Sequence, residues 1–146
     1  MVMVETDTRL LSDYPIIRRI PTRWMDNDAY GHVNNVTYYS YFDTAVNGYL
    51  IEKDVLDYLH GQTIGLVVET SCKYMKSLEF PDIVLAGVAV SHIGNSSVRY
   101  EIGLFKEGDT DPAAQGYFIH VYVDKATRRP VNIDSTLRYV LEEMSI

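Results

Sequence analysis

The sequence predicts an α+β fold in which one long helix covers one face of an antiparallel sheet. Residues 35–50 carry apolar side chains three or four positions apart, the spacing of a buried helix face. Four runs of strand-forming residues follow, separated by turn residues. Because a sheet must cover its apolar face, one helix followed by successive strands is typical of an α+β domain.

The N-terminal part of the chain is expected to contain a polar, frayed segment at residues 1–13 and then a strand. Apolar and polar residues alternate over residues 14–24, which predicts a strand that leads into a loop. The long helix is expected to begin at Asn34 or Asn35, because an asparagine side chain can accept hydrogen bonds from the free amides of the first turn. A short second helix is expected at residues 54–59.

The rest of the chain is expected to consist of strands, turns and a terminal helix. The predicted strands occupy residues 63–75, 83–93, 97–106 and 115–124. Gly94-Asn95 marks a tight hairpin between the second and third of these strands. Polar residues predict a loop at 107–114 and a turn at 125–130, and a short helix is expected at 135–144.

Length and composition favour a single soluble domain over residues 1–146. The chain is long enough for one core, and 47% hydrophobic with 23% charged residues is typical of globular proteins. No apolar stretch approaches the roughly 20 residues that cross a bilayer, and charged residues interrupt the N-terminus where a signal peptide would be apolar. The single cysteine, Cys72, excludes an intrachain disulfide. A cytoplasmic location is therefore expected.

The overall charge limits the classes of partner. A net charge of −7 and a pI near 4.9 argue against nucleic acid or an anionic membrane as a main partner. The four histidines do not form an HxxxH or HExxH pair, so no metal site is expected.

The residues that suggest chemistry lie between positions 26 and 43, which read DNDAYGHVNNVTYYSYFD. Asp26 and Asp28 are two residues apart in a stretch expected to be extended, so both carboxylates could face one pocket. Gly31 allows a backbone conformation that other residues resist. The start of the following helix offers unpaired N–H groups and partial positive charge, which would stabilise the oxyanion formed by attack on a carbonyl.

An aspartate beside such a helix start could attack the carbonyl directly or deprotonate a water. The chain lacks the GxSxG sequence of a serine nucleophile elbow. Asp and Asn are also ordinary turn and cap residues, so on spacing alone a purely structural function of this segment stays open.

The same segment has the pattern DxDxxGHVNNxxYxxYxD, which resembles the signature of the 4-hydroxybenzoyl-CoA thioesterase-like branch of the hotdog-fold acyl-CoA thioesterases. The matching residues are Asp26, Asp28, Gly31, His32, Val33, Asn34, Asn35, Tyr38, Tyr41 and Asp43. The similarity extends through residues 67–82 and 121–133, so that it covers most of the chain. The resemblance implies a hotdog fold, in which an antiparallel sheet wraps around a central helix.

The resemblance also implies an acyl-CoA thioesterase that releases a carboxylic acid and CoA without a cofactor. The family's catalytic carboxylate falls on Asp28, as nucleophile or general base, and its oxyanion-binding amides fall near residues 31–35. His32 is expected to fix the loop, with proton donation to the leaving thiolate as the alternative. The catalytic candidates are Asp28, Gly31, His32 and Asn35. The substrate-binding candidates are Asp26, Val33, Asn34, Tyr38, Tyr41, Arg128 and Arg129.

Because CoA is anionic, an acidic chain needs a local basic group to hold it. Arg128 and Arg129 are the first candidates, since a guanidinium can donate two hydrogen bonds to one phosphate. Lys73 and Lys76 are the next candidates, and a solvated turn with no ligand is the alternative.

The partners expected are an acyl thioester, carried by CoA or an acyl carrier protein, and further copies of the chain. Both faces of the strand at 115–124 are rich in apolar or aromatic residues, which favours cover by another subunit in a homodimer or homotetramer. Two other functions stay open. One is hydration or dehydration of enoyl-thioesters, which GHVNN fits poorly, and the other is acyl binding without catalysis.

Overall fold

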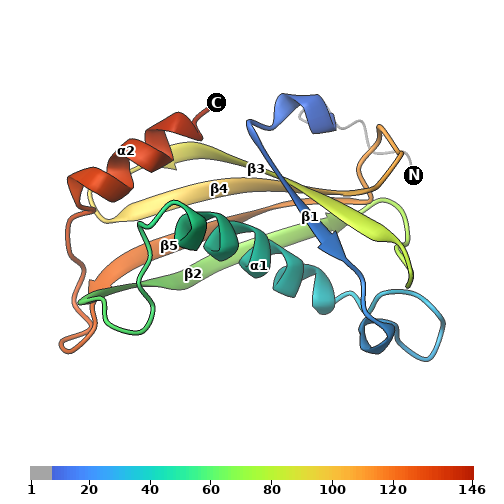
Figure 1. Cartoon of the computed structure of the whole chain (residues 1–146), viewed down its shortest axis with the longest axis horizontal. Helices are drawn as coiled ribbons and strands as arrows, with labels where there is room; N and C mark the ends of the chain where they lie inside the picture. Colours follow the sequence, from blue (N-terminus) through green and yellow to red (C-terminus); the bar gives the residue numbers. More distant parts are fainter. Residues whose placement is uncertain (1–7) are drawn as a thin grey trace.

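The protein folds into a five-stranded antiparallel sheet with a long helix against one face (Figure 1). The structure is a computed structural model and describes residues 8–146. The order of strands in the sheet is β1-β3-β4-β5-β2. The strands are β1 (Ile16–Pro21), β2 (Thr63–Tyr74), β3 (Ile83–Ile93), β4 (Ser97–Lys106) and β5 (Ala114–Asp124). The helices are α1 (Thr37–Glu52) and α2 (Ser135–Glu143). The predicted α+β class is confirmed.

Helix α1 supplies one half of the core. Its buried residues recur every three or four positions, namely Tyr38, Tyr41, Phe42, Ala45, Val46, Tyr49 and Leu50. They pack against inward side chains of β3, β4 and β5, such as Val88, Ile102 and Phe118. Burial of each large apolar side chain contributes about 1.5–3 kcal/mol, so this face holds the helix on the sheet. Gly116 of β5 lies directly under Phe42, where a side chain would collide with the ring.

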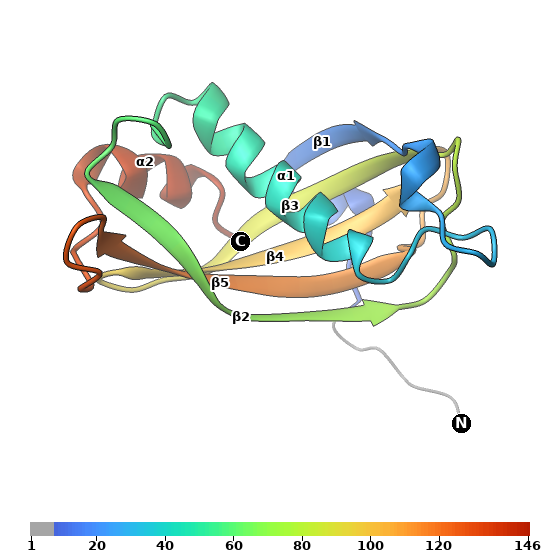
Figure 2. The same ribbon diagram turned by 90° about the horizontal axis from the view of Figure 1, so that it is seen from below.

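Strand β2 forms one edge of the sheet, and Figure 2 shows it running below α1. It pairs only with β5 among the described strands, and a bulge between Val67 and Glu69 interrupts that ladder. Val67 and Val68 are 46% and 58% exposed on this edge. A long edge strand with exposed valines is a surface on which another strand can pair.

Three element boundaries differ from the predictions. The strand predicted at 14–24 is confined to Ile16–Pro21, because a 3-10 turn occupies Trp24–Asp26. Helix α1 begins at Thr37 rather than at Asn34 or Asn35, and its N-cap residue, Val36, has helical backbone angles and no side-chain cap.

The helix predicted at 54–59 is absent, and that segment consists of turns and irregular loop. Asp54 has a φ of 59°, outside the right-handed helical region. The Asp57 carboxylate accepts hydrogen bonds from the amides of Leu59 and His60, which replaces helical hydrogen bonds by a side-chain turn.

The N- and C-terminal segments pack against the sheet. A 3-10 turn at Leu11–Asp13 shows that part of the segment predicted to be frayed is ordered, and residues 1–7 lie outside the described residues. At the other end, the Asp134 carboxylate caps α2 by accepting from the Leu137 amide at 2.8 Å. No helix within residues 8–146 is long and apolar enough to span a membrane.

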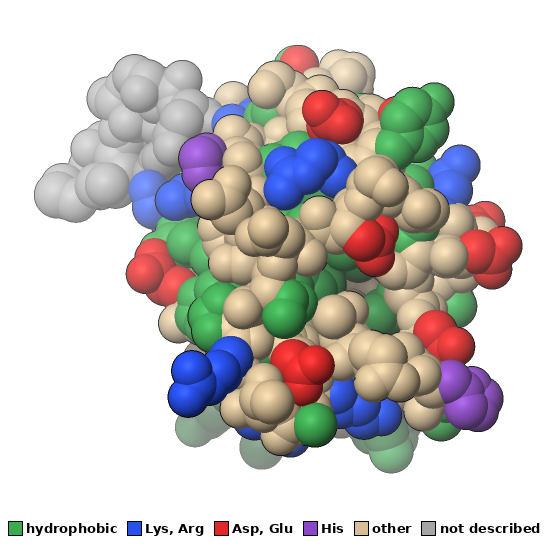
Figure 3. Space-filling view, turned by 90° about the vertical axis from the view of Figure 1, so that its left-hand side faces the viewer, with side chains coloured by type: hydrophobic (Ala, Val, Ile, Leu, Met, Phe, Trp, Pro, Cys, Tyr) green, Lys and Arg blue, Asp and Glu red, His purple; other side chains and the backbone are tan. Residues whose placement is uncertain are grey.

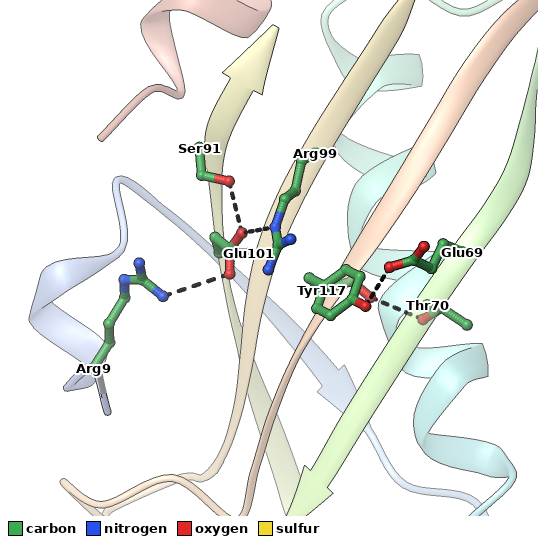
Figure 4. A network of polar contacts seen from close by, with 7 residues as sticks. All are labelled: Arg9, Glu69, Thr70, Ser91, Arg99, Glu101 and Tyr117. Carbon is green, nitrogen blue, oxygen red and sulfur yellow. Dashed lines mark hydrogen bonds and ion pairs between the residues drawn. The ribbon is translucent and has the colours of Figure 1, made fainter. Parts of the chain in front are cut away.

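A polar network lies on the sheet face opposite α1 (Figure 4). Glu101 accepts hydrogen bonds from Ser91 and Arg99, both at 2.6 Å. The Arg99 guanidinium stacks 3.9 Å above the Tyr117 ring, and the Tyr117 hydroxyl donates to Glu69. On this outer face of β5, the Tyr117 ring is therefore flanked by the charged side chains of Arg99 and Glu69.

Candidate active site

The loop between β1 and α1 is anchored by the buried carboxylate of Asp26, which is 2% exposed. Asp26 accepts hydrogen bonds from the Arg23 amide and guanidinium and from the Tyr41 hydroxyl. Burial alone would raise the pKa of Asp26, but the hydrogen bonds from Arg23 and Tyr41 outweigh it and hold that pKa below its ordinary value. Asp26 therefore stays ionised and ties the loop to α1.

Asp28 lies in a tight turn that the backbone closes around it. Its amide donates to the His32 carbonyl at 2.8 Å, and its carbonyl accepts from the Gly31 amide at 3.2 Å. One carboxylate oxygen accepts from the Tyr30 amide at 2.8 Å. Gly31 has a φ of 83°, a conformation that favours glycine, and the space beside it is open. Gly31 is thus needed for the shape of the turn.

Asp28 faces a cleft of about 340 Å³, which we call the Asp28 cleft. Its lining residues are Asp28, His32, Val33, Asn35, Tyr38, Tyr74, Met75, Lys76 and Ser77. One wall is the loop and first turn of α1, and the other wall is the end of β2 with the residues after it. The two walls are far apart in the sequence and meet because α1 packs against the sheet in which β2 pairs with β5.

Hydrogen bonds hold the two walls together. The Tyr74 hydroxyl donates to the Asn35 carbonyl at 2.9 Å. The Leu78 carbonyl accepts from the Val33 amide at 2.7 Å, and the Leu78 amide donates to the Tyr38 hydroxyl at 3.3 Å. The loop that carries Asp28 is therefore fixed against the β2 end.

Only part of the predicted oxyanion-binding region has open amides. The amides of Gly31, Val33 and Asn34 donate to backbone carbonyls. Those of His32 and Asn35 donate no hydrogen bond within residues 8–146. Both residues line the cleft, and Asn35 lies two residues before α1, near the helix end whose free amides and dipole favour negative charge.

The structure separates the predicted site residues into two groups. Those that line the Asp28 cleft are Asp28, His32, Val33, Asn35 and Tyr38. Those that do not line it are Asp26, Gly31, Asn34 and Tyr41. The prediction that the carboxylates of Asp26 and Asp28 face one pocket is wrong, because Asp26 ends a 3-10 turn in which the rule for extended backbone does not hold.

The remaining predicted residues, Arg128 and Arg129, lie in the turn after β5. This turn is at the opposite end of the sheet from the Asp28 cleft. Strands β2 and β5 are antiparallel, and Asp124, just before the turn, pairs with Thr63 at the start of β2. Tyr74, which lines the cleft, is at the other end of β2 and pairs with Ala114. Figure 3 shows that end of the molecule, where basic and acidic side chains are interspersed. Arg128 and Arg129 are therefore not part of the cleft within one chain.

Sequence reasoning missed Tyr74, Met75 and Ser77 as cleft residues, since they belong to no motif. Lys76, predicted as a secondary phosphate-binding candidate, does line the cleft, and its ammonium lies 3.9 Å from the carboxylates of Asp109 and Asp111. The described part of the chain contains no group of three His, Cys, Asp or Glu side chains placed to hold a metal ion.

The single thiol belongs to the fold rather than to the cleft. Cys72 packs against the core, and burial raises its pKa to about 11. It is therefore protonated at neutral pH and a poor nucleophile.

Comparisons with known proteins place this chain in a family. The sequence pattern of the thioesterase-like superfamily matches residues 22–141. The uncharacterized protein YsmA of Bacillus subtilis is 25% identical over 122 residues, covering 83% of this chain and 81% of YsmA.

Solved structures share the fold over most of their length. The PA5185 protein of Pseudomonas aeruginosa is 49% identical, with a TM-score of 0.92 over 94% of this chain and 96% of that one. The PA2801 protein of the same species is 26% identical, with a TM-score of 0.81 over 91% and 99%. The DHNA-CoA thioesterase of Staphylococcus aureus, at 22% identity and a TM-score of 0.75 over 87% and 86%, shares the fold. The resemblance seen in the Asp28 motif is confirmed, and the chain belongs to the thioesterase-like superfamily of hotdog-fold thioester hydrolases.

Proposed function

We propose that this protein hydrolyses an acyl-CoA thioester to a carboxylic acid and CoA at the Asp28 cleft. The main support for the proposal is that one cleft near the start of α1 contains the half-buried carboxylate of Asp28 and the amides of His32 and Asn35, which donate no hydrogen bond within residues 8–146. Membership of the thioesterase-like superfamily supports the same reaction.

In this proposal, the thioester carbonyl oxygen accepts hydrogen bonds from the Asn35 and His32 amides. The charge that develops on that oxygen is stabilised by the amides and by the positive end of α1. Asp28 either attacks the carbonyl carbon, to form an anhydride that water then hydrolyses, or removes a proton from an attacking water. In both cases the C–S bond breaks, the acyl carbon gains the water oxygen, and the CoA thiolate takes up a proton.

The hydrogen bonds of the turn explain how Asp28 would be held for this reaction. The Tyr30 amide occupies one carboxylate oxygen, and the other has no partner among residues 8–146. His32 fixes the turn through its carbonyl, which accepts from the Asp28 amide, so its main contribution is to position the carboxylate. Such preorganisation lowers the cost of reaching the reactive geometry.

The active form in this proposal is a homodimer joined along β2. The exposed edge of β2, with Val67 and Val68, supports this contact. A twofold axis through the middle of the strand would set Thr63 opposite Tyr74 of the partner subunit. Because Asp124 pairs with Thr63, the turn with Arg128 and Arg129 would then lie near the partner's Asp28 cleft, where guanidinium groups can bind the phosphates of CoA.

The test is thiol release from a panel of acyl-CoAs by the wild type, by Asp28→Asn and by the control Glu142→Gln. Glu142 is an exposed carboxylate on α2, away from the cleft. The proposal expects turnover by the wild type and the control, and loss of turnover only in Asp28→Asn. Failure of the wild type to release thiol from any acyl-CoA contradicts it.

A further inference from the structure

Four large apolar side chains are exposed on the two loops that border the Asp28 cleft. The loop at 22–36 joins β1 to α1, the loop at 75–82 joins β2 to β3, and both lie at the same end of the molecule in Figure 1 and Figure 2. We call the four side chains the aromatic tip: Trp24 is 79% exposed, Met25 73%, Tyr30 86% and Phe80 37%. Large apolar side chains exposed together usually mark a binding surface.

The two loops of the aromatic tip are tied to each other. The Trp24 and Phe80 rings meet edge to face, with centroids 5.9 Å apart. The Asn27 side chain accepts a hydrogen bond from the Phe80 amide at 3.1 Å, and the Val33 amide donates to the Leu78 carbonyl at 2.7 Å. The exposed rings are therefore presented by loops that are fixed against each other.

The proposed dimer leaves the aromatic tip open. The order of strands puts β1 and β2 at opposite edges of the sheet. Trp24 follows the end of β1, and Phe80 precedes the start of β3, which is the neighbour of β1. A partner joined along β2 is therefore at the far edge of the sheet from these two rings.

The charges beside the aromatic tip limit the surfaces that it fits. The loops at 22–36 and 75–82 carry two cations, Arg23 and Lys76, against the four carboxylates of Asp26, Asp28, Glu79 and Asp82. Arg23 is paired with Asp26 at 2.9 Å, and the Lys76 ammonium lies 3.9 Å from the carboxylates of Asp109 and Asp111. Because both cations are already neutralised and the chain has a net charge of −7, the tip does not attract an anionic surface.

The side chains of the aromatic tip suit the interface of a lipid bilayer. Trp and Tyr concentrate where a bilayer meets water, because each ring has an apolar body and one polar N–H or O–H group. Met and Phe add apolar surface without a charge that would have to leave water. A fluid lipid surface can close around side chains that protrude this far, whereas a protein partner would need a matching hollow. A zwitterionic lipid surface therefore complements the tip in both polarity and charge.

The aromatic tip is continuous with the Asp28 cleft. Tyr30 lies in the turn that holds Asp28, and its amide donates to the Asp28 carboxylate at 2.8 Å. On the other loop, Phe80 lies three residues after Ser77, which lines the cleft. A lipid surface that touches the tip is therefore next to the cleft. A thioester with a long apolar acyl chain partitions into such a surface, because burial of its methylene groups is favourable.

We propose that the aromatic tip docks on a zwitterionic lipid surface, and that the Asp28 cleft takes long-chain acyl thioesters from that surface. The contact with lipid stands on the tip alone, whereas the delivery of substrate rests on the proposed thioesterase function. The contact should be weak and reversible, because even a single myristoyl chain gives only marginal membrane binding.

The first test uses Trp24 as the probe. It is the single tryptophan of the chain, so tryptophan fluorescence reports on the tip alone. With phosphatidylcholine vesicles at millimolar lipid, the emission should shift to shorter wavelength, and phosphatidylcholine brominated on its acyl chains should quench it. Unchanged emission overturns the contact, even if the protein sediments with the vesicles, because Trp24 would then stay in water.

The second test measures sedimentation with the same vesicles. Trp24→Ser should weaken binding by at least about tenfold, the scale of burying one large apolar side chain. The control is Tyr139→Ser, at a 63% exposed tyrosine on α2, and it should bind as the wild type does. If Trp24→Ser does not fold, Met25→Ser replaces it with the same expectation. Equal binding by the wild type and the folded tip variant overturns the contact.

Two further measurements exclude other partners. Replacing part of the phosphatidylcholine by phosphatidylglycerol should weaken binding, and stronger binding that high salt abolishes would overturn the assignment to zwitterionic lipid. Light scattering without lipid should give the same mass for the wild type and Trp24→Ser. A smaller mass for the variant would identify the tip as a contact between copies of the chain and overturn the proposal.

Turnover separates the delivery of substrate from the proposed function. For palmitoyl-CoA held in phosphatidylcholine vesicles, Trp24→Ser should lower kcat/KM by about tenfold, whereas for soluble butanoyl-CoA it should stay within about twofold. An equal effect on both substrates overturns delivery from lipid and leaves the thioesterase function standing. No thiol release from any acyl-CoA contradicts the thioesterase function itself, and the fluorescence of Trp24 still decides the contact with lipid.

Discussion

The Tyr41 hydroxyl donates a 2.8 Å hydrogen bond to the buried carboxylate of Asp26, which links helix α1 to the loop that carries Asp28. The contact joins the core to the site, since Tyr41 lies on the buried face of α1 and Asp26 accepts the Asn34 amide through its carbonyl. Burial, and then the contact with Asp26, raises the pKa of Tyr41 far above its ordinary value, so the phenol stays a donor.

Removing that donor should weaken the fold more than the chemistry. Tyr41→Phe leaves Asp26 one hydrogen bond short in a buried position, and we expect it to lower the free energy of unfolding by about 1–3 kcal/mol. Denaturant unfolding followed by circular dichroism measures this, with Tyr39→Phe as control because no hydrogen bond of the Tyr39 hydroxyl is found within residues 8–146. Equal stability of the two variants would show that the Tyr41–Asp26 contact contributes nothing net.

The two neighbouring aspartates should respond in opposite ways. Asp28→Asn is expected to keep the stability of the wild type and to lower kcat for thioester hydrolysis by at least about a hundredfold, the scale of a lost acid-base group. Asp26→Asn is expected to lower stability and to cost less activity, because its carboxylate anchors the loop. A larger loss of activity in Asp26→Asn would assign the catalytic carboxylate to Asp26.

If the proposed dimer forms along the β2 edge, a charge added to that edge should weaken dimerisation. Light scattering should give a mass of at least about twice 16.7 kDa for the wild type. Val68→Lys adds a charge to the exposed bulge and should shift the equilibrium toward monomers. Thr110→Lys, in an exposed loop, is the matched control. A wild-type mass of 16.7 kDa at all micromolar concentrations would contradict the dimer.

Binding of CoA across that dimer gives a kinetic prediction. Replacing Arg128 and Arg129 by alanine should raise KM for acyl-CoA several-fold and weaken its dependence on salt, since phosphate contacts made by these residues are screened by ions. The kcat should change little, because the same contacts hold substrate and transition state alike. Unchanged KM and salt dependence would identify the turn as solvated, and Lys76 would then be the cation to replace.

His120 predicts a loss of stability in mild acid. The unfolded chain binds a proton at this residue near pH 6.5, whereas burial lowers the pKa in the folded state to about 4. Between these values the unfolded state holds more protons, so stability should fall as pH falls, by up to about 3 kcal/mol in all. Unfolding free energies measured from pH 7 to 4 should show this slope in the wild type and a flatter one in His120→Phe. Parallel curves would contradict the buried, neutral imidazole.

The sequence predicted what depends on local pattern and missed what depends on pairing between distant segments. The periodicity of α1 and the positions of Asp28, His32 and Asn35 before it were sufficient to predict the helix and one wall of the cleft. The other wall, at Tyr74 and Ser77, is determined by the register of β2 on β5, which no local pattern encodes.

Two further differences have the same cause. The sequence did not single out His120 among the residues of β5, because residues on both faces of that strand are apolar or aromatic. Only the packed structure shows that His120 lines a cavity. The helix was predicted to start at Asn34 or Asn35, but the Asn34 side chain bonds to the Val36 amide at 3.1 Å in the loop, and the helix begins after it.

The two walls of the Asp28 cleft are built in different ways, and this has a consequence for redesign. The turn that carries Asp28 is made by backbone hydrogen bonds and by the φ of 83° at Gly31, so few substitutions there would preserve its geometry. On the facing wall, Met75 and Ser77 contribute exposed side chains, and substituting them leaves the turn untouched. Under the proposed function, Asp28 is thereby separate from the surface that an acyl group would fill, and substitutions at positions 75 and 77 would change the acyl preference while Asp28 stays in place.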